Sequence, residues 1–79
     1  MRLDKYLKVS RLIKRRTVAQ EACAAGKVAV NSKVQKASYD VKVGDVIELT
    51  FGEKVLKVQV VSILEHVRKE DADAMYKPL

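Results

Sequence analysis

The sequence holds few of the residues on which common binding and catalytic sites depend. Its single cysteine, Cys23, has no partner for an internal disulfide. One cysteine and one histidine cannot supply the ligands of a tetrahedral zinc site. The three glycines lie too far apart for a phosphate-cradling P-loop, and no apolar run approaches the roughly 18 residues of a membrane span. Disulfide scaffolds, zinc fingers, P-loop nucleotidases and membrane-spanning proteins are therefore disfavoured.

The chain also lacks a recognisable catalytic arrangement. His66 has no nucleophile that pairs with it in the sequence, and we predict a surface histidine at the end of the last strand. Asp71 and Asp73 are two residues apart and would not share a face of a helix. Cys23 lies among small residues, which is typical of a packing role. We therefore expect a protein that is not an enzyme and that needs no cofactor or metal.

The size and composition are typical of one small globular domain, with 79 residues, 48% hydrophobic and 33% charged. We expect this domain to span residues 1–79 and to be a monomer. Basic residues interrupt every apolar run near the N-terminus, so the pattern of a secretory signal is absent. Because the one cysteine is also unpaired, we expect the protein in the cytoplasm.

The positive charge is concentrated at one end of the sequence. The net charge of +6 comes entirely from residues 1–16, because nine basic and nine acidic side chains cancel in residues 17–79. A charge this localised favours a polyanion such as nucleic acid, or an anionic membrane surface. The basic segment would form a helix of only about two turns with a small apolar face, which anchors weakly to a membrane. We therefore expect no membrane partner.

Helical periodicity is found in two segments of the N-terminal third. Leu3, Tyr6 and Leu7 share one face of a predicted helix over residues 3–9. The opposite arc of that helix carries Asp4, Lys5 and Lys8. Residues 10–16 form a basic connector, in which Leu12 and Ile13 are the expected core anchors.

A second helix is predicted over residues 18–25. Thr17 is a suitable N-cap, Gln20 completes a capping box, and Gly26 ends the helix. The residues of this helix are small and apolar nearly all round, so we expect it to pack against neighbours on several sides.

Beyond Gly26 the pattern alternates and predicts short strands at residues 27–30, 33–36, 46–51 and 54–64, with turns between them. The pair Asn31-Ser32 forms the first turn, whose type the sequence leaves open. Phe51 follows the buried positions Ile47 and Leu49 and is expected in the core. Residues 68–76 favour a short helix, and fraying of the segment 68–79 is an equal alternative. The predicted fold class is α+β, with two helices followed by a small antiparallel sheet.

The densest basic cluster stands directly before the second predicted helix. A helix N-terminus offers unpaired amide N–H groups and about half a positive charge, which suits phosphate. Guanidinium groups beside it add bidentate donors. We predict that this cluster and the basic arc of the first helix bind phosphate, and a solvated face that only aids solubility is the alternative. These candidates are Arg2, Lys5, Lys8, Arg11, Lys14, Arg15, Arg16 and Thr17.

Asp4 is the lone acid in this basic cluster. It either favours the first helix through the helix dipole or orients a neighbouring arginine for RNA, and the sequence does not choose between the two roles. Asn31, Lys33 and Lys36 extend the basic half of the chain across the first turn. The two lysines serve either phosphate contact or protection of a sheet edge.

Aromatic residues are few, and no stacking motif for single-stranded RNA is present. The predicted mode of binding is therefore contact with the backbone and shape of folded RNA.

Four motifs occur in order along residues 1–51. They are Met-Arg-Leu-Asp-Lys-Tyr-Leu-Lys at the start, Ser-Arg-Leu-Ile-Lys-Arg-Arg-Thr from Ser10, Gly-Lys-Val-Ala-Val-Asn-Ser from Gly26, and Val-Gly-Asp from Val43. With these motifs the chain resembles the RNA-binding domain named after small-subunit ribosomal protein S-four. The resemblance implies two N-terminal helices packed on a small antiparallel sheet, with the alpha-L motif as the RNA-binding element. Ser32 departs from the family pattern, in which glycine is common after the asparagine, and an extra strand pair follows Phe51.

Among short members of this family, the sequence resembles the ribosome-associated quality-control branch, RqcP. It lacks the long basic C-terminal extension of the branch of the fifteen-kilodalton heat-shock protein. The resemblance to RqcP implies binding to stalled large ribosomal subunits through ribosomal RNA and peptidyl-tRNA, in support of C-terminal alanine tailing by the partner RqcH. It also implies that Arg2, Asp4 and Arg16 lie at the RNA interface. A ribosome rescue factor like the heat-shock protein, or an accessory subunit of an RNA-modifying enzyme, is the alternative.

Overall fold

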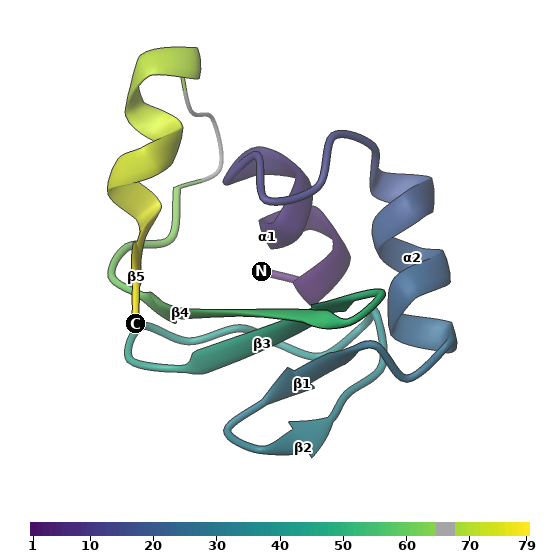
Figure 1. Ribbon diagram of the computed structural model, residues 1–79. Coiled ribbons are helices and arrows are strands. Elements are labelled where there is room, and N and C mark those ends of the chain that lie inside the picture. The colour runs from purple at the N-terminus through teal and green to yellow at the C-terminus, as the bar shows by residue number, and fades with distance from the viewer. Residues whose placement is uncertain (65–67) are drawn as a thin grey trace.

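The computed structural model describes residues 1–64 and 68–79, so the prediction for His66 lies outside the described residues (Figure 1). Two α-helices come first, α1 (Leu3–Val9) and α2 (Arg16–Ala24). Four strands follow, β1 (Val28–Val30), β2 (Lys33–Val34), β3 (Val46–Phe51) and β4 (Lys54–Val60). A 3₁₀-helix, η1 (Lys69–Met75), and a last strand, β5 (Tyr76–Pro78), complete the order. The predicted α+β class is confirmed.

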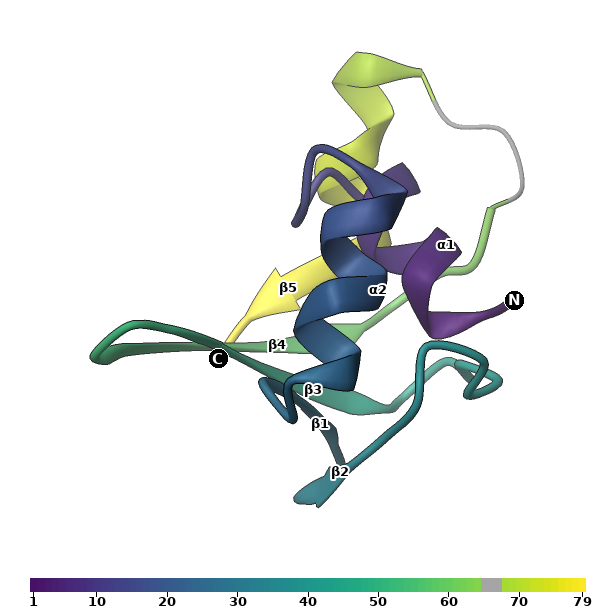
Figure 2. The ribbon, with the colours of Figure 1, turned by 90° about the vertical axis from the view of Figure 1, so that its right-hand side faces the viewer.

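The strands form one antiparallel sheet in the order β2-β1-β3-β4-β5. Both views place α1, α2 and η1 on the same side of this sheet (Figures 1 and 2). The core therefore lies in a single layer between the helices and one face of the sheet. Its largest buried side chains are Leu3, Tyr6 and Leu7 from α1, Ile47 and Leu49 from β3, and Met75 from η1.

Residues 68–79 fold onto the body of the protein as η1 and β5. The sequence left a short helix and fraying open for this segment, and the structure has the helix. β5 pairs with β4, and the buried Tyr6 hydroxyl donates a hydrogen bond to the Met75 carbonyl oxygen at 2.7 Å. Burial raises the pKa of Tyr6 above its ordinary value, so the hydroxyl remains a donor. Among the described residues, no helix is both long and apolar enough to cross a membrane.

The turn between β1 and β2 is a two-residue loop of type I′. Asn31 and Ser32 both have positive φ, 52° and 70°, as this turn type requires. The Asn31 side chain also fastens the loop to the sheet, because its amide donates to Asp45 at 3.1 Å and its oxygen accepts from the Val46 N–H at 3.0 Å.

The predicted start of the second helix, at residue 18 with Thr17 as its N-cap, is wrong. The helix begins at Arg16, and Arg15 stands at the N-cap with no side-chain hydrogen bond. Thr17 therefore lies inside the helix and does not cap it. The prediction of packing on several sides is also wrong, because only Ala19 and Cys23 of α2 are buried, on the side facing the core.

Phe51 was expected in the core and is 48% exposed. It lies at the end of β3, where it pairs with Lys54 across the hairpin, and Figure 2 shows this hairpin extending past the helices. Alternation along β3 buries Ile47 and Leu49, whereas Phe51 lines an open hollow together with Val18 and Ala22 of α2. The strands predicted at residues 33–36 and 54–64 are likewise shorter in the structure, ending at Val34 and Val60.

Candidate RNA interface

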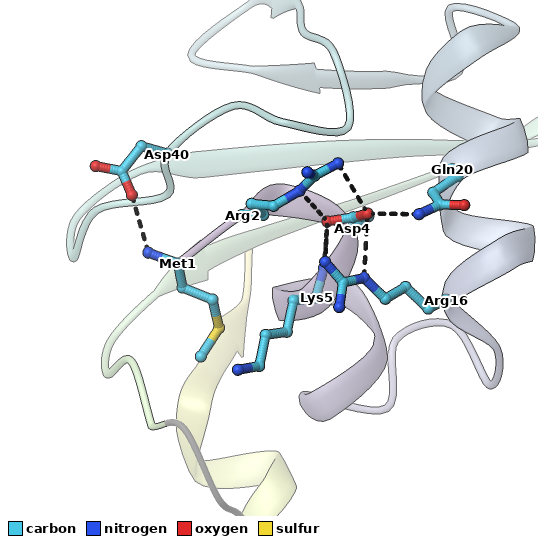
Figure 3. A network of polar contacts seen from close by, with 7 residues as sticks. All are labelled: Met1, Arg2, Asp4, Lys5, Arg16, Gln20 and Asp40. Atoms are coloured by element: carbon cyan, nitrogen blue, oxygen red, sulfur yellow. Dashed lines mark hydrogen bonds and ion pairs between the residues drawn. The ribbon is translucent and has the colours of Figure 1, made fainter.

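A buried carboxylate organises the basic end of the chain. Asp4 lies in the first turn of α1 and is 0% exposed, so its expected place on the polar arc of the helix is wrong. Its two oxygens accept from Arg2, whose Nε lies at 3.2 Å, and from Arg16, whose Nε lies at 3.1 Å. The Gln20 amide donates at 2.9 Å and the Lys5 backbone N–H at 2.8 Å. Figure 3 shows these groups converging on Asp4 from α1, α2 and the residue before α1.

The same contacts keep Asp4 ionised. Burial by itself would raise the pKa of this carboxyl. The hydrogen bonds from Gln20, Arg16, Lys5 and Arg2 outweigh burial and lower the pKa to about 2. A permanent negative charge is thus held below the surface between two arginines.

The two arginines remain partly open to solvent. The Arg2 side chain is 52% exposed and the Arg16 side chain 44%. Each guanidinium directs two nitrogens, Nε and Nη2, to Asp4. A guanidinium has five N–H donors in a rigid fork, so three on each arginine are left for an anion from outside. Of the two roles that the sequence allowed for Asp4, the structure therefore supports the orientation of arginines.

Asp4 is itself held by the chain that follows the first hairpin. Its backbone N–H donates to the Ala37 carbonyl at 3.1 Å, and the N–H of Leu3 donates to the Tyr39 carbonyl at 2.8 Å. Lys36 lies beside this contact and lines one hollow together with Gln20. The structure thus brings one lysine of the second basic group next to the Asp4 contacts.

The other predicted residues lie at several separate places. Lys8, Arg11 and Lys14 line a hollow beside the turn between α1 and α2, whereas Arg15 and Thr17 are exposed at the start of α2. Lys33 lies on β2, which is an edge strand, as edge protection requires. Asn31 uses its side-chain amide within the fold. Lys5 extends away from Asp4 in Figure 3.

Gln20 is the functional candidate that sequence reasoning missed. The capping-box pattern predicted that its side chain would turn back to the start of α2, but it reaches across to Asp4 on α1. Only the packing of α1 against α2 brings the two residues together, and they lie 16 positions apart in the chain. No local pattern could have indicated this contact.

The comparisons with known proteins agree with this geometry. The S4 domain family matches residues 1–47. The "RQC P-site tRNA stabilizing factor" of Streptococcus pneumoniae is 53% identical over 77 residues, which cover 98% of this chain and 88% of the relative. The protein of the same name from Halalkalibacterium halodurans is 52% identical with the same coverage.

A solved structure shows the same fold. Heat Shock Protein 15 of Vibrio cholerae, described as trimeric, superposes with a TM-score of 0.92 and is 30% identical, covering all of this chain and 81% of that one. Its identity is well below that of the two tRNA-stabilizing factors, which favours their branch over the heat-shock branch. The chain therefore belongs to the S4 domain family and, within it, to the group of RQC P-site tRNA stabilizing factors.

Proposed function

We propose that this protein is a non-catalytic RNA-binding factor of ribosome-associated quality control that stabilises P-site tRNA on the large ribosomal subunit. The observation that carries the proposal is the pair of half-exposed arginines, Arg2 and Arg16, held by one buried carboxylate. The names of the two tRNA-stabilizing relatives described above support the choice of RNA and of process. Such a protein would work in the cytoplasm.

The mechanism is positioning. A flexible arginine loses conformational freedom when it binds phosphate, whereas Arg2 and Arg16 are already restrained by Asp4. Two fixed guanidiniums also define the separation and angle of the phosphates that they accept. The protein would hold one tRNA geometry on the subunit through contacts with ribosomal RNA and tRNA, while the partner RqcH extends the nascent chain with alanine.

Salt-dependent binding to ribosomal subunits tests this function. The protein is sedimented with purified large subunits, with and without peptidyl-tRNA, across a salt series. Neutralising about five phosphates would give a slope of log K against log salt of roughly −3.5 to −4.5. We expect tighter binding when peptidyl-tRNA is present. Equal binding to any RNA would contradict the assignment to quality control.

Arg16→Ala locates the interface in the same assay. Loss of a charged hydrogen bond should weaken binding by about 1.5–3 kcal/mol without unfolding the domain. Lys57→Ala is the matched control, because Lys57 lies on β4 beside Glu48 at 3.9 Å and should contribute little. Equal loss in both variants would indicate diffuse attraction by the net charge.

A further inference from the structure

The two α-helices end in the same backbone conformation with different residues. After α2, Gly26 has a φ of 75°, and its N–H and that of Lys27 close the helix onto Cys23 and Ala22. After α1, the equivalent position holds Arg11 with a φ of 63°. This left-handed conformation is one that glycine adopts freely and that a residue with a Cβ adopts at a cost. An arginine in this conformation points to a function for its side chain.

The turn that carries Arg11 is closed by its own hydrogen bonds. The Arg11 N–H donates to the Lys8 carbonyl at 3.0 Å. The Leu7 carbonyl accepts from the Ile13 N–H at 3.0 Å and from the Ser10 hydroxyl at 3.3 Å. Carbonyl oxygens at a helix C-terminus would otherwise repel an anion. Here the Leu7 and Lys8 carbonyls accept these hydrogen bonds, which hold the turn in one shape.

Beside this turn lies a polar hollow of about 210 Å³, lined by Lys8, Val9, Arg11 and Lys14. Of the described residues that line it, Lys8, Arg11 and Lys14 are cationic and exposed. Within residues 1–64 and 68–79, none of the three has an ion pair or a side-chain hydrogen bond. Three unpaired cations around one hollow favour a compact anion of the size of a phosphate.

This hollow is separate from the arginine pair at Asp4. Arg2 precedes α1 and Lys8 lies in its last turn, so the helix rise places their backbones about 9 Å apart along the axis. Neither Arg2 nor Arg16 lines the hollow. We propose that the hollow at Lys8, Arg11 and Lys14 is a second phosphate site, which takes a backbone phosphate of the bound RNA while Arg2 and Arg16 take another. The choice of RNA as the source of that phosphate rests on the function proposed above.

Arg11→Gly tests the second site without damaging the fold. Glycine suits the left-handed conformation, so the variant should unfold at the same urea concentration as the unmodified protein or a higher one. Its affinity for large subunits carrying peptidyl-tRNA should fall about five- to tenfold. The magnitude of the salt slope should fall by about one phosphate contact. Arg11→Lys keeps the cation and should retain most of the affinity.

Inorganic phosphate provides a probe that is independent of RNA. Titrating it into ¹⁵N-labelled protein should shift the amide signals of residues 8–14, and these shifts should be lost in Arg11→Gly. If the unmodified protein fails to bind subunits, the proposed function is wrong, whereas the phosphate titration still decides the anion site. If Arg16→Ala weakens subunit binding and Arg11→Gly leaves it unchanged, with no phosphate shifts at residues 8–14, the second site alone is overturned.

Discussion

Two buried aspartates, Asp4 in the helical half and Asp45 before β3, both accept hydrogen bonds but differ in the groups that donate to them. Asp4 is 0% exposed and Asp45 is 8% exposed. Each carboxylate accepts several hydrogen bonds, as a buried charge requires. The donors to Asp4 include two guanidiniums that also face solvent. The donors to Asp45 are neutral and belong to the fold.

Asp45 joins three segments of the chain. It accepts from the Asn31 amide at 3.1 Å, the Tyr39 hydroxyl at 3.0 Å and the Lys42 backbone N–H at 3.0 Å. Burial and this hydrogen bond to Asp45 raise the pKa of Tyr39. The comparison teaches that a buried carboxylate stabilises the groups that donate to it. At Asp45 these groups belong to a turn and a loop, and at Asp4 they include the two arginines of the proposed RNA surface.

The largest effect is expected for Asp4→Ala. Removing the carboxylate leaves two neighbouring cations without their counter-charge. Because both are partly hydrated, the free energy of unfolding should fall by about 2–3 kcal/mol, less than for a fully buried pair. RNA binding should weaken more than tenfold, since the arginines are no longer restrained. Urea unfolding and the sedimentation assay measure the two effects.

Asp45→Ala is the control for that comparison. Its unfolding free energy should fall by a similar amount, because three donors lose their acceptor. RNA binding of the folded protein should stay near that of the unmodified chain. If Asp45→Ala weakens RNA binding as much as Asp4→Ala does, the distinction between the two aspartates is wrong.

Acid should lower the free energy of unfolding by protonating Asp4. The pKa of Asp4 is about 2 in the folded protein against 3.8 as the ordinary value. The carboxyl therefore stabilises the fold at pH values above 3.8, and this stability, about 2 kcal/mol, is lost as the pH falls from 3.8 to 2. Urea unfolding of the protein and of Asp4→Asn between pH 7 and pH 2 measures it as the difference between the two curves. Parallel curves would show that Asp4 carries no such linkage.

The smallest effect is expected for Gln20→Ala. Gln20 is a neutral donor to the ionised Asp4 carboxylate. A hydrogen bond to a charged group contributes about 1.5 kcal/mol at the low end of its range, which suits a side chain as exposed as Gln20. RNA affinity should fall only two- to threefold, because both arginines still hold Asp4. Gln20→Glu should be worse than Gln20→Ala, since it places a second negative charge against the carboxylate. The same two assays compare the variants.

Local patterns predicted those parts of the fold that depend on neighbours in the sequence. The apolar spacing of residues 3–9 predicts the bounds of α1 correctly, and Gly26 does end α2. Alternation predicts the bounds of β3 correctly as well. Each of these depends on backbone geometry within a few residues.

Two of the errors concern long-range packing. The periodicity of α1 places Asp4 on its polar arc, but α2 and its two polar side chains cover that position. The exposure of Phe51 depends on how far the helices extend over the sheet. The interface residues inferred from the family, Arg2, Asp4 and Arg16, do meet in space. Their contact with RNA stays a prediction.

The hydrogen bond from Tyr6 to Met75 has a consequence for how the protein is made. α1, one of the two helices of the proposed RNA surface, is synthesised first, whereas η1 and β5, which support it from the side, are synthesised last. An incomplete nascent chain therefore has its basic helix exposed without that support. The proposed RNA surface should become rigid only after residues 75–78 have been translated and can pack against Tyr6.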